Sequence, residues 1–210
     1  MRAASTMTRL ALERVRYAVG DHVEPAAARE LRTLLAEHGA VPSDAPTHII
    51  TTSTDAPLVR AHAAHAVTPT WVHRSAALGA AQPEELFSAD PAMIFSGIVV
   101  TCAGLSAHDT ELISAAVTAL GGGARISLCA EVTHVVTYTL DTSKVAALRH
   151  SPDPIPVVAP HWINDCFSLR RRIPLDDYVF DLHTGAEPLC LRASSERRMR
   201  AHAPPPPPAR

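Results

Sequence analysis

Histidines are the residues of this chain most able to carry acid–base or metal chemistry, and there are twelve of them. His48 and His134 each follow a threonine at the start of an apolar run. One histidine ring in each copy provides neither a cluster of metal ligands nor a second base. His62, His65 and the others lack the His-Glu-x-x-His spacing that puts two ligands on one helix face. We interpret His48 and His134 as structural core residues, and we expect no metal site and no cofactor.

Cysteines and glycines give no sign of catalysis either. Phosphate-cradling glycines follow a strand and open a helix, whereas Gly121-Gly122-Gly123 follows a predicted helix and so ends it. Unpaired thiols without a Cys-x-x-Cys motif are typical of a reducing compartment. No nucleophile–base pair or carboxylate dyad is evident, and the sequence therefore predicts a protein that is not an enzyme. The four cysteines are Cys102, Cys129, Cys166 and Cys190.

The elements that position these residues occur twice along the chain. The pattern Val-x-Pro-x-Trp-aliphatic occurs at 67–72 and again at 158–163, and it contains both tryptophans of the chain. Thr-His followed by aliphatic residues begins at Thr47 and again at Thr133. A period this long is too large for a solenoid, so each copy should be a small domain. Two glycine pairs were matched in the same way, Gly20 with Gly104 and Gly39 with Gly122.

Strands and helices are predicted to alternate in each copy, which favours parallel sheets covered on both faces. The first copy predicts strands at 16–19, 40–41, 47–51 and 66–67, with helices at 25–38, 58–65 and 69–78. The second predicts strands at 98–102, 124–127, 133–137 and 156–158, with helices at 109–120, 143–149 and 160–170. Ser106 and Asp109 match a capping box at the start of one helix. Each tryptophan falls in the first turn of the last helix of its copy.

The composition limits the size of the hydrophobic cores and the classes of ligand that the chain can bind. The 210 residues are 47% hydrophobic, enough for two modest cores. The net charge of −2 provides no field that would hold nucleic acid, so direct nucleic-acid binding is not expected. No apolar run is long enough to span a membrane. The predicted organisation is a first domain at 14–80, a linker at 81–94, a second domain at 95–182 and a disordered Pro-rich tail at 183–210.

These landmarks resemble those of the BRCT repeat, the family named for the C-terminus of the breast-cancer susceptibility protein. The family pattern is a first strand ending near Gly, a helix closed by Gly-Gly, a Thr-His-aliphatic strand and a last helix entered through Val-x-Pro-x-Trp. The resemblance covers roughly Arg16–Phe180 and implies an α/β fold of two tandem BRCT domains, each with a four-stranded parallel sheet and about three helices. Within the family, the pair most resembles the N-terminal repeats of fungal multi-BRCT and PTIP-like genome-maintenance scaffolds, on features such as residues 95–100.

The resemblance implies phosphopeptide binding at a defined pocket. In the family a Ser or Thr, the amide of the following Gly and a Lys or Arg on the second helix hold the phosphate. Such contacts suit a dianion, since each charge-assisted hydrogen bond is worth roughly 1.5–3 kcal/mol. The second copy matches with Gly104, Thr142 and Lys144, although Ala103 replaces the hydroxyl residue. The first copy is the second choice, with Gly20 and Arg60, and Val19 in place of the hydroxyl.

The sequence therefore predicts a nuclear protein-interaction scaffold in the DNA damage response and DNA repair, with phosphorylated or unmodified proteins as partners. Two alternatives remain open. The pair could recognise partners without any phosphate, or the chain could be a regulatory fragment of a DNA ligase or polymerase. A basic cluster at 197–200 is a candidate part of a nuclear-import signal.

Overall fold

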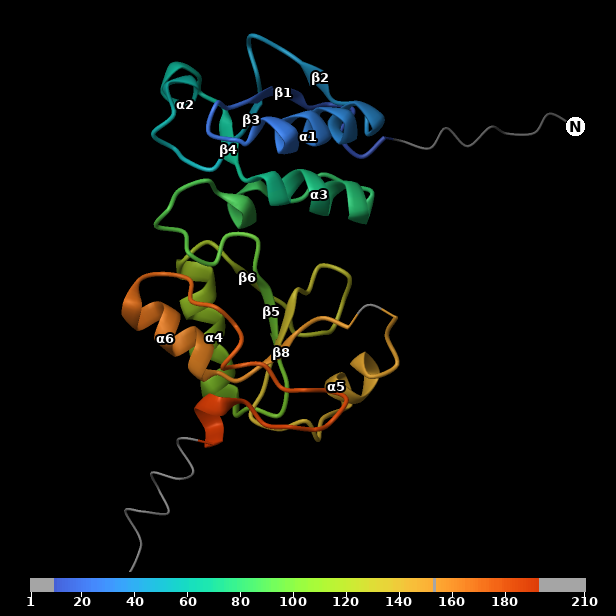
Figure 1. The fold of residues 1–210 in the computed structure, drawn as a ribbon, viewed down its shortest axis with the longest axis vertical. Helices are drawn as coiled ribbons and strands as arrows, with labels where there is room; N and C mark the ends of the chain where they lie inside the picture. The colour runs from blue at the N-terminus through green and yellow to red at the C-terminus, as the bar shows by residue number, and fades with distance from the viewer. Residues whose placement is uncertain (1–9, 153, 193–210) are drawn as a thin grey trace, which may run out of the picture. The chain divides into compact units, whose positions relative to one another are not determined.

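The computed structural model describes residues 10–152 and 154–192, and it contains two four-stranded sheets (Figure 1). The strand orders are β2-β1-β3-β4 and β6-β5-β7-β8. Strand β1 pairs in parallel with β2 and β3, β3 with β4, and β7 with β5 and β8. In both sheets the chain order is therefore the same. This confirms the predicted α/β class with one parallel sheet in each copy.

The first sheet is built around its third strand. All three residues of β3 are buried, because the strand pairs on both sides and both of its faces are covered. Tyr17 pairs with His48, and His48 pairs in turn with His65. The strands are β1 Arg16–Val19, β2 Val41–Pro42, β3 His48–Ile50 and β4 His65–Val67.

The helices of the first domain begin and end where the sequence provides caps. The carboxylate of Glu24 accepts hydrogen bonds from the amides of Ala26 at 2.9 Å and Ala27 at 3.0 Å, which satisfies two donors at the start of α1. Gly79 ends α3 with φ +65°, a conformation that glycine adopts without a Cβ penalty. Helices α1 and α3 run side by side (Figure 1). The helices are α1 Pro25–Glu37, α2 Pro57–Ala61 and α3 Pro69–Leu78.

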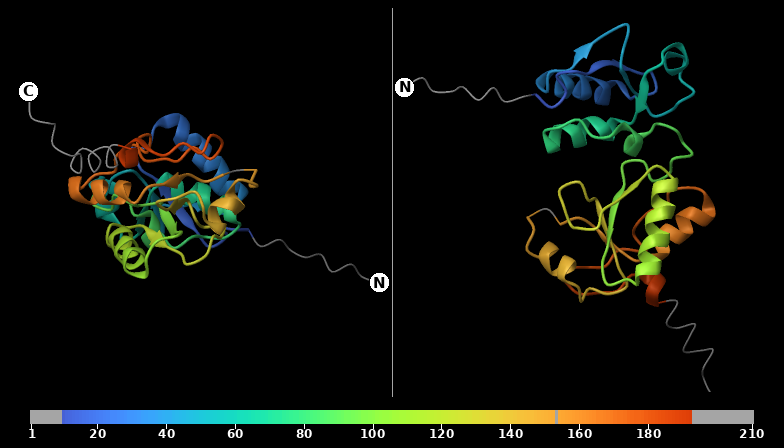
Figure 2. Two further views of the ribbon diagram at one scale, coloured as in Figure 1. Left: turned by 90° about the horizontal axis from the view of Figure 1, so that it is seen from below. Right: turned by 180° about the vertical axis from the view of Figure 1, so that it is seen from behind.

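The second domain repeats this arrangement. Helices α4 and α6 lie on one side of the sheet and α5 lies on the other (Figure 2). One half of the predicted capping box is present, because the Ser106 hydroxyl accepts from the Asp109 amide at 3.0 Å; the same hydroxyl donates to the Asp109 carboxylate at 2.7 Å. The strands are β5 Val99–Cys102, β6 Gly123–Ala124, β7 His134–Val136 and β8 Val157–Val158; the helices are α4 Ala107–Ala119, α5 Ser143–Leu148 and α6 His161–Leu169.

Strand register corrects the predicted pairing of Gly20 with Gly104. Tyr17 pairs with His48, and Val100 pairs with His134, so Gly20 corresponds to Ala103. The amides of Gly20 and Ala103 donate to equivalent carbonyls, each at 2.9 Å. Gly104 lies one residue later and has φ +63°. The predicted equivalence is shifted by one residue because it matched glycine with glycine, whereas the hydrogen-bonded register of the strands determines which residues correspond.

The second glycine pair shifts in the same way. Gly39 has φ +85° and its amide donates to a carbonyl three residues earlier at 3.1 Å. Gly121, rather than Gly122, does the same with φ +82° and a distance of 3.2 Å. Each is the left-handed residue that ends the first helix of its domain. The equivalence is therefore Gly39 with Gly121.

Residues 81–94, which we predicted to be a linker, are folded. They contain the short 3-10 helix η1 Glu84–Phe87, and Phe87 is buried in the first hydrophobic core. The amide of Thr68 donates to the Phe87 carbonyl at 2.8 Å, and the amide of Ala89 donates to the Ala66 carbonyl at 3.0 Å. Much of this segment thus covers the strand and helix that end the first copy.

The predicted disordered tail also differs over its described part. Leu182, Cys190 and Leu191 pack against the hydrophobic core that contains Phe180. The amide of Cys190 donates to the carbonyl of Asp177 at 3.2 Å. Residues 183–192 are therefore part of the second domain. Residues 193–210, with the basic cluster and the proline run, lie outside the described residues.

Candidate functional site

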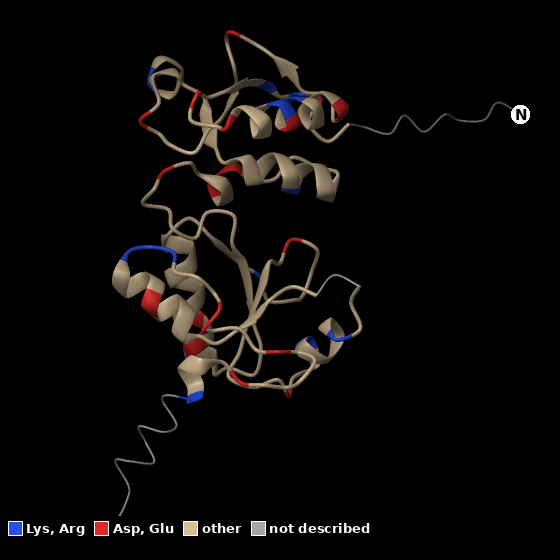
Figure 3. Cartoon of the chain, viewed as in Figure 1, with Lys and Arg blue, Asp and Glu red and all other residues tan. Residues whose placement is uncertain are grey.

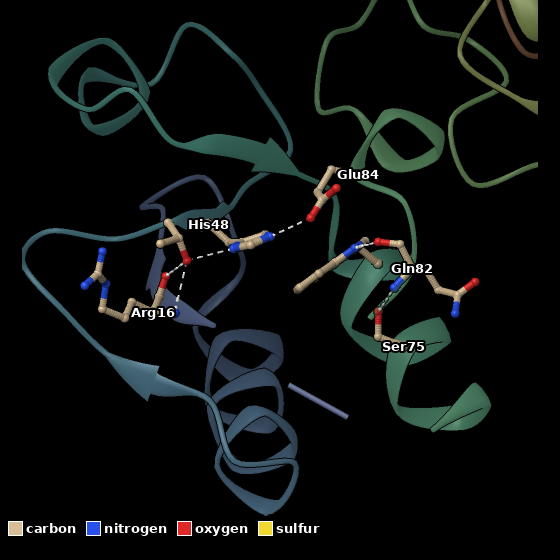
Figure 4. Close-up of polar contacts among 7 residues, drawn as sticks. Arg16, His48, Ser75, Gln82 and Glu84 are labelled. Atoms are coloured by element: carbon tan, nitrogen blue, oxygen red, sulfur yellow. Dashed lines mark hydrogen bonds and ion pairs between the residues drawn. The ribbon is translucent and has the colours of Figure 1, made fainter. Parts of the chain in front are cut away.

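A histidine stacks on the tryptophan in the core of the first domain, and Figure 4 shows that His48 points toward Glu84. Trp71 is fully buried, and its ring lies 4.7 Å from that of His48, with 19° between the planes. The indole Nε1 donates to the carbonyl of Gln82 at 2.8 Å. His48 Nδ1 lies 2.9 Å from the Thr47 hydroxyl, and its Nε2 donates to the Glu84 carboxylate at 3.0 Å. Both ring systems therefore hold the chain that follows α3.

Burial is the main electrostatic influence on this histidine. It lowers the pKa of His48, and the adjacent Glu84 carboxylate opposes part of that shift. Burial also pushes the pKa of Glu84 upward, but hydrogen bonds from its own amide and from His48 leave that pKa below its usual value. His48 is accordingly a neutral donor to an ionised carboxylate near pH 7. Such a pair stabilises the fold and offers no free general base.

The second domain contains the same core with different charges around it. Trp162 is 1% exposed, its ring lies 5.3 Å from that of His134, and its Nε1 donates to the carbonyl of Ile173 at 3.0 Å. His134 Nδ1 lies 2.8 Å from the Thr133 hydroxyl. Burial, reinforced by the positive charge of Arg172, lowers the pKa of His134 to about 4. Both tryptophans and both histidines thus lie in the cores, where they leave no ring open to a substrate.

Gly104 and Thr142, two of the three predicted phosphate-site residues, lie in contact. A Cβ built on Gly104 would meet Cγ2 of Thr142 at 3.0 Å and Cγ2 of Thr139 at 3.8 Å. Thr142 is the N-cap of α5, where its hydroxyl accepts from the Val145 amide at 3.3 Å. The left-handed backbone of Gly104 and the close threonines leave no room for a side chain. Methyl groups of these threonines therefore lie against the backbone of Gly104, shortly after the end of β5.

Lys144, the third predicted residue, directs its ammonium group at the protein itself. Nζ donates to the Thr101 hydroxyl and the Cys102 carbonyl, each at 2.7 Å, and to the Ile126 carbonyl at 2.6 Å. An ammonium group has three protons, so these acceptors occupy all of them. Lys144 therefore joins β5, α5 and the loop after β6. A phosphate at Gly104 would have to compete with a neutral acceptor for one of these protons.

The second-choice site in the first domain is less complete. Gly20 donates its amide to the Ile50 carbonyl at 2.9 Å, and the Arg60 guanidinium donates to the Asp55 carbonyl at 2.5 Å. By strand register, Asp21 stands at the position of Gly104. A carboxylate at that position would repel a phosphate. Gly20 and Arg60 thus each donate to a backbone carbonyl of the first domain.

Other chemistry finds little support in the part of the chain that the structure describes. Within those residues no group of three or more His, Cys, Asp and Glu side chains could hold a metal ion. No described helix is long and apolar enough to cross a membrane. The described Lys and Arg residues occur on several separate elements rather than along one (Figure 3). Burial is the main cause that raises the pKa of the Cys102, Cys166 and Cys190 thiols, which makes them poor nucleophiles.

Residues 137–141, which follow β7 and which we call the strap, are a part of the site that was not predicted from the sequence. The Thr137 hydroxyl accepts from the Thr139 amide at 3.2 Å and donates to the Thr139 carbonyl at 2.9 Å. The Thr139 hydroxyl then accepts from the Asp141 amide at 3.1 Å. This chain of turns fixes residues 137–141 beside Gly104. The alternation of Thr and Asp was the available signal, because these side chains bond the backbone two residues on.

Comparison with known proteins finds one matching family model and relatives that are similar to this chain. Residues 91–167 match the family described as the BRCA1 C Terminus (BRCT) domain. PAX-interacting protein 1 of Bos taurus is 32% identical over 161 residues, which are 74% of this chain and 16% of that protein. BRCT-containing protein 1 of Schizosaccharomyces pombe is 27% identical over 95 residues, 45% of this chain and 11% of that protein. This chain therefore spans a small part of either relative.

A solved structure also matches this chain, at lower identity. The crystal structure of yeast Rtt107 and Mms22 matches with a TM-score of 0.47 and 16% identity, over 90% of this chain and 48% of that chain. The similarity predicted from the sequence, to PTIP-like and fungal BRCT proteins, is confirmed by the two relatives.

Proposed function

Residues 91–167 form a BRCT domain, and from that premise we propose that this chain is a non-enzymatic protein-interaction module. We place it in the DNA damage response and genome maintenance, in the nucleus. One relative is named for its interaction with another protein, which supports a binding role. The observation that carries the proposal is the closeness of Gly104, an exposed residue after β5, to Thr142 at the start of α5, with a lysine on the same helix.

The finer proposal is a phosphorylated ligand at the second domain. A phosphate beside Gly104 would accept from the backbone amide of this exposed residue and from the Thr142 hydroxyl. Lys144 would donate one hydrogen bond to the phosphate in place of its bond to the carbonyl of Ile126, which also accepts from the Thr101 hydroxyl at 3.3 Å. Both bonds have an ionised donor, but only the phosphate adds an ionised acceptor, so this exchange favours the dianion. The first domain is the weaker candidate because Asp21 stands at the equivalent position.

A binding mode without phosphate is the second candidate. Its support is the Lys144 ammonium group, which already has three acceptors within the protein. If those bonds persist in the bound state, Lys144 has a structural role. The partner then binds to surface groups other than the Lys144 ammonium group. The first mode predicts that a phosphopeptide binds better than its unphosphorylated twin, and the second predicts that the two bind equally.

An array of phosphoserine and phosphothreonine peptides, each beside its unphosphorylated twin, separates these modes. The whole chain, Lys144→Met and Arg171→Met would be applied to it. Arg171 is an exposed cation of the same domain outside the proposed pocket, and so controls for net charge. Phosphate-dependent spots that fade with Lys144→Met alone support the pocket. Equal binding to both members of each pair supports the phosphate-independent mode. Phosphate-dependent spots that Lys144→Met does not weaken would remove Lys144 from the pocket.

A further inference from the structure

A polar hollow opens next to the proposed phosphate pocket. It has a volume of about 330 Å³ and lies between the strap after β7, the end of α5 and the segment after Phe180. Thr139 belongs to both places, because it lines the hollow and stands 3.8 Å from the Cβ position of Gly104. The hollow is lined by Thr139, Leu140, Asp141, Arg149, Phe180, Gly185 and Glu187.

Both walls of the hollow are held in place by hydrogen bonds. On one side, Thr137 and Thr139 fix the strap as described above. On the other, the Asp181 carboxylate accepts from the His183 amide at 2.8 Å, the Thr184 amide at 3.1 Å and the Thr184 hydroxyl at 2.6 Å. That turn leads to Gly185 and Glu187. A hollow with fixed walls loses little entropy when a ligand enters it.

The lining combines an apolar surface with excess negative charge. Leu140 and the buried Phe180 supply the apolar part. Asp141 and Glu187 bring two negative charges and Arg149 brings one positive, so the formal sum is −1. Lysine and arginine side chains fit such a lining, because their aliphatic stems pack on apolar groups while the charged ends reach carboxylates.

We infer that this hollow takes the side chain of a Lys or Arg that flanks the phosphorylated residue of the bound peptide. The inference rests on the proposed phosphate site, and it adds the class of peptide that the site selects. An extended chain advances about 3.3–3.6 Å per residue, so a residue close to the phosphate reaches past Thr139 into the hollow. A Glu or Asp at that position meets two carboxylates instead.

The test uses phosphothreonine peptides in which each flanking position in turn is Lys, Ala or Glu, titrated into the whole chain by fluorescence polarisation. At one position Lys should bind about fivefold better than Ala, as expected for partly exposed charge pairs, and Glu should bind worse. Asp141→Asn/Glu187→Gln should lose this preference and still distinguish each phosphopeptide from its unphosphorylated twin. Glu111→Gln/Asp176→Asn, which removes two exposed carboxylates outside the hollow, should keep it.

Three results would overturn the inference while the phosphate site stands: no flanking preference, a preference for Glu through Arg149, or a Lys preference that survives Asp141→Asn/Glu187→Gln. If no phosphopeptide binds better than its twin, the proposed phosphate site fails and the hollow has no such role. Thermal melting of both double variants checks that they remain folded.

Discussion

Lys144 donates a hydrogen bond to the backbone carbonyl of Ile126 at 2.6 Å, across 18 residues of chain. The same ammonium group also holds the buried hydroxyl of Thr101 and the carbonyl of Cys102. One side chain thus joins a strand, a helix and a loop of the second domain. Any role of Lys144 in binding phosphate must be separated from this role in the fold.

Lys144→Met should therefore lower the free energy of unfolding of the second domain. The change keeps the apolar stem and removes three hydrogen bonds from a cation, so a loss of about 1–3 kcal/mol is expected. Urea denaturation measures it. Arg171→Met, at an exposed position, should stay within about 0.5 kcal/mol of the parent chain. Equal stability of both variants would show that the Lys144 contacts do not persist in solution.

Replacement of either tryptophan by alanine should destabilise its own domain by roughly 3–5 kcal/mol. Trp71 and Trp162 are 0 and 1% exposed, so truncation leaves a cavity beside a stacked histidine. Phe167→Ala, at a residue 39% exposed, is the matched aromatic control and should cost much less. Calorimetry of the three variants gives the comparison. A tryptophan variant that melts like the parent chain would place that ring outside its core.

His134 should make the second domain sensitive to acid. Its pKa is about 4 in the folded chain and about 6.5 when unfolded, so the unfolded state binds more protons between these values. The stability that depends on neutral His134 is complete above pH 6.5 and is lost as the pH falls toward 4. The loss is about 3 kcal/mol. His134→Gln should flatten this part of the stability profile, measured by urea titrations at a series of pH values. His48→Gln should flatten it less, because Glu84 offsets part of the shift at His48.

Glu84→Ala should weaken the first domain through the segment that covers Trp71. The Glu84 carboxylate accepts from His48 at 3.0 Å, and its side chain is 30% exposed, so a cost of about 1 kcal/mol is expected at pH 7. Glu85→Ala changes an exposed neighbour and should have little effect. Hydrogen exchange of the amides at 82–90 reports the local loosening. Unchanged exchange in Glu84→Ala would indicate that other contacts hold this segment.

Local signals in the sequence predicted most of the fold. The bounds of β1 and α3 agree with the prediction, because α3 begins at Pro69 and ends before the left-handed Gly79. The tryptophans and the Thr-His pairs were matched correctly between copies. The glycine pairs were not, since a shift of one residue is invisible until strand register is known.

Contacts between distant residues account for what the sequence could not predict. His48 meets Glu84 across 36 residues, and each indole donates to a carbonyl 11 residues later, a contact that needs no particular residue type. The direction of the Lys144 ammonium group depends on carbonyls of β5 and the loop after β6. Composition alone suggested a linker at 81–94, where one buried phenylalanine instead attaches the segment to the core.

The central claim is that the second domain holds a phosphorylated ligand at Gly104 and Thr142. Its most direct test is the titration of a phosphothreonine peptide into the isotope-labelled chain, followed by amide resonances in solution NMR. We predict saturable shifts at Gly104 and at the first residues of α5, absent with the unphosphorylated twin. Shifts centred on Gly20 and Asp21, or equal shifts with both peptides, would contradict the account.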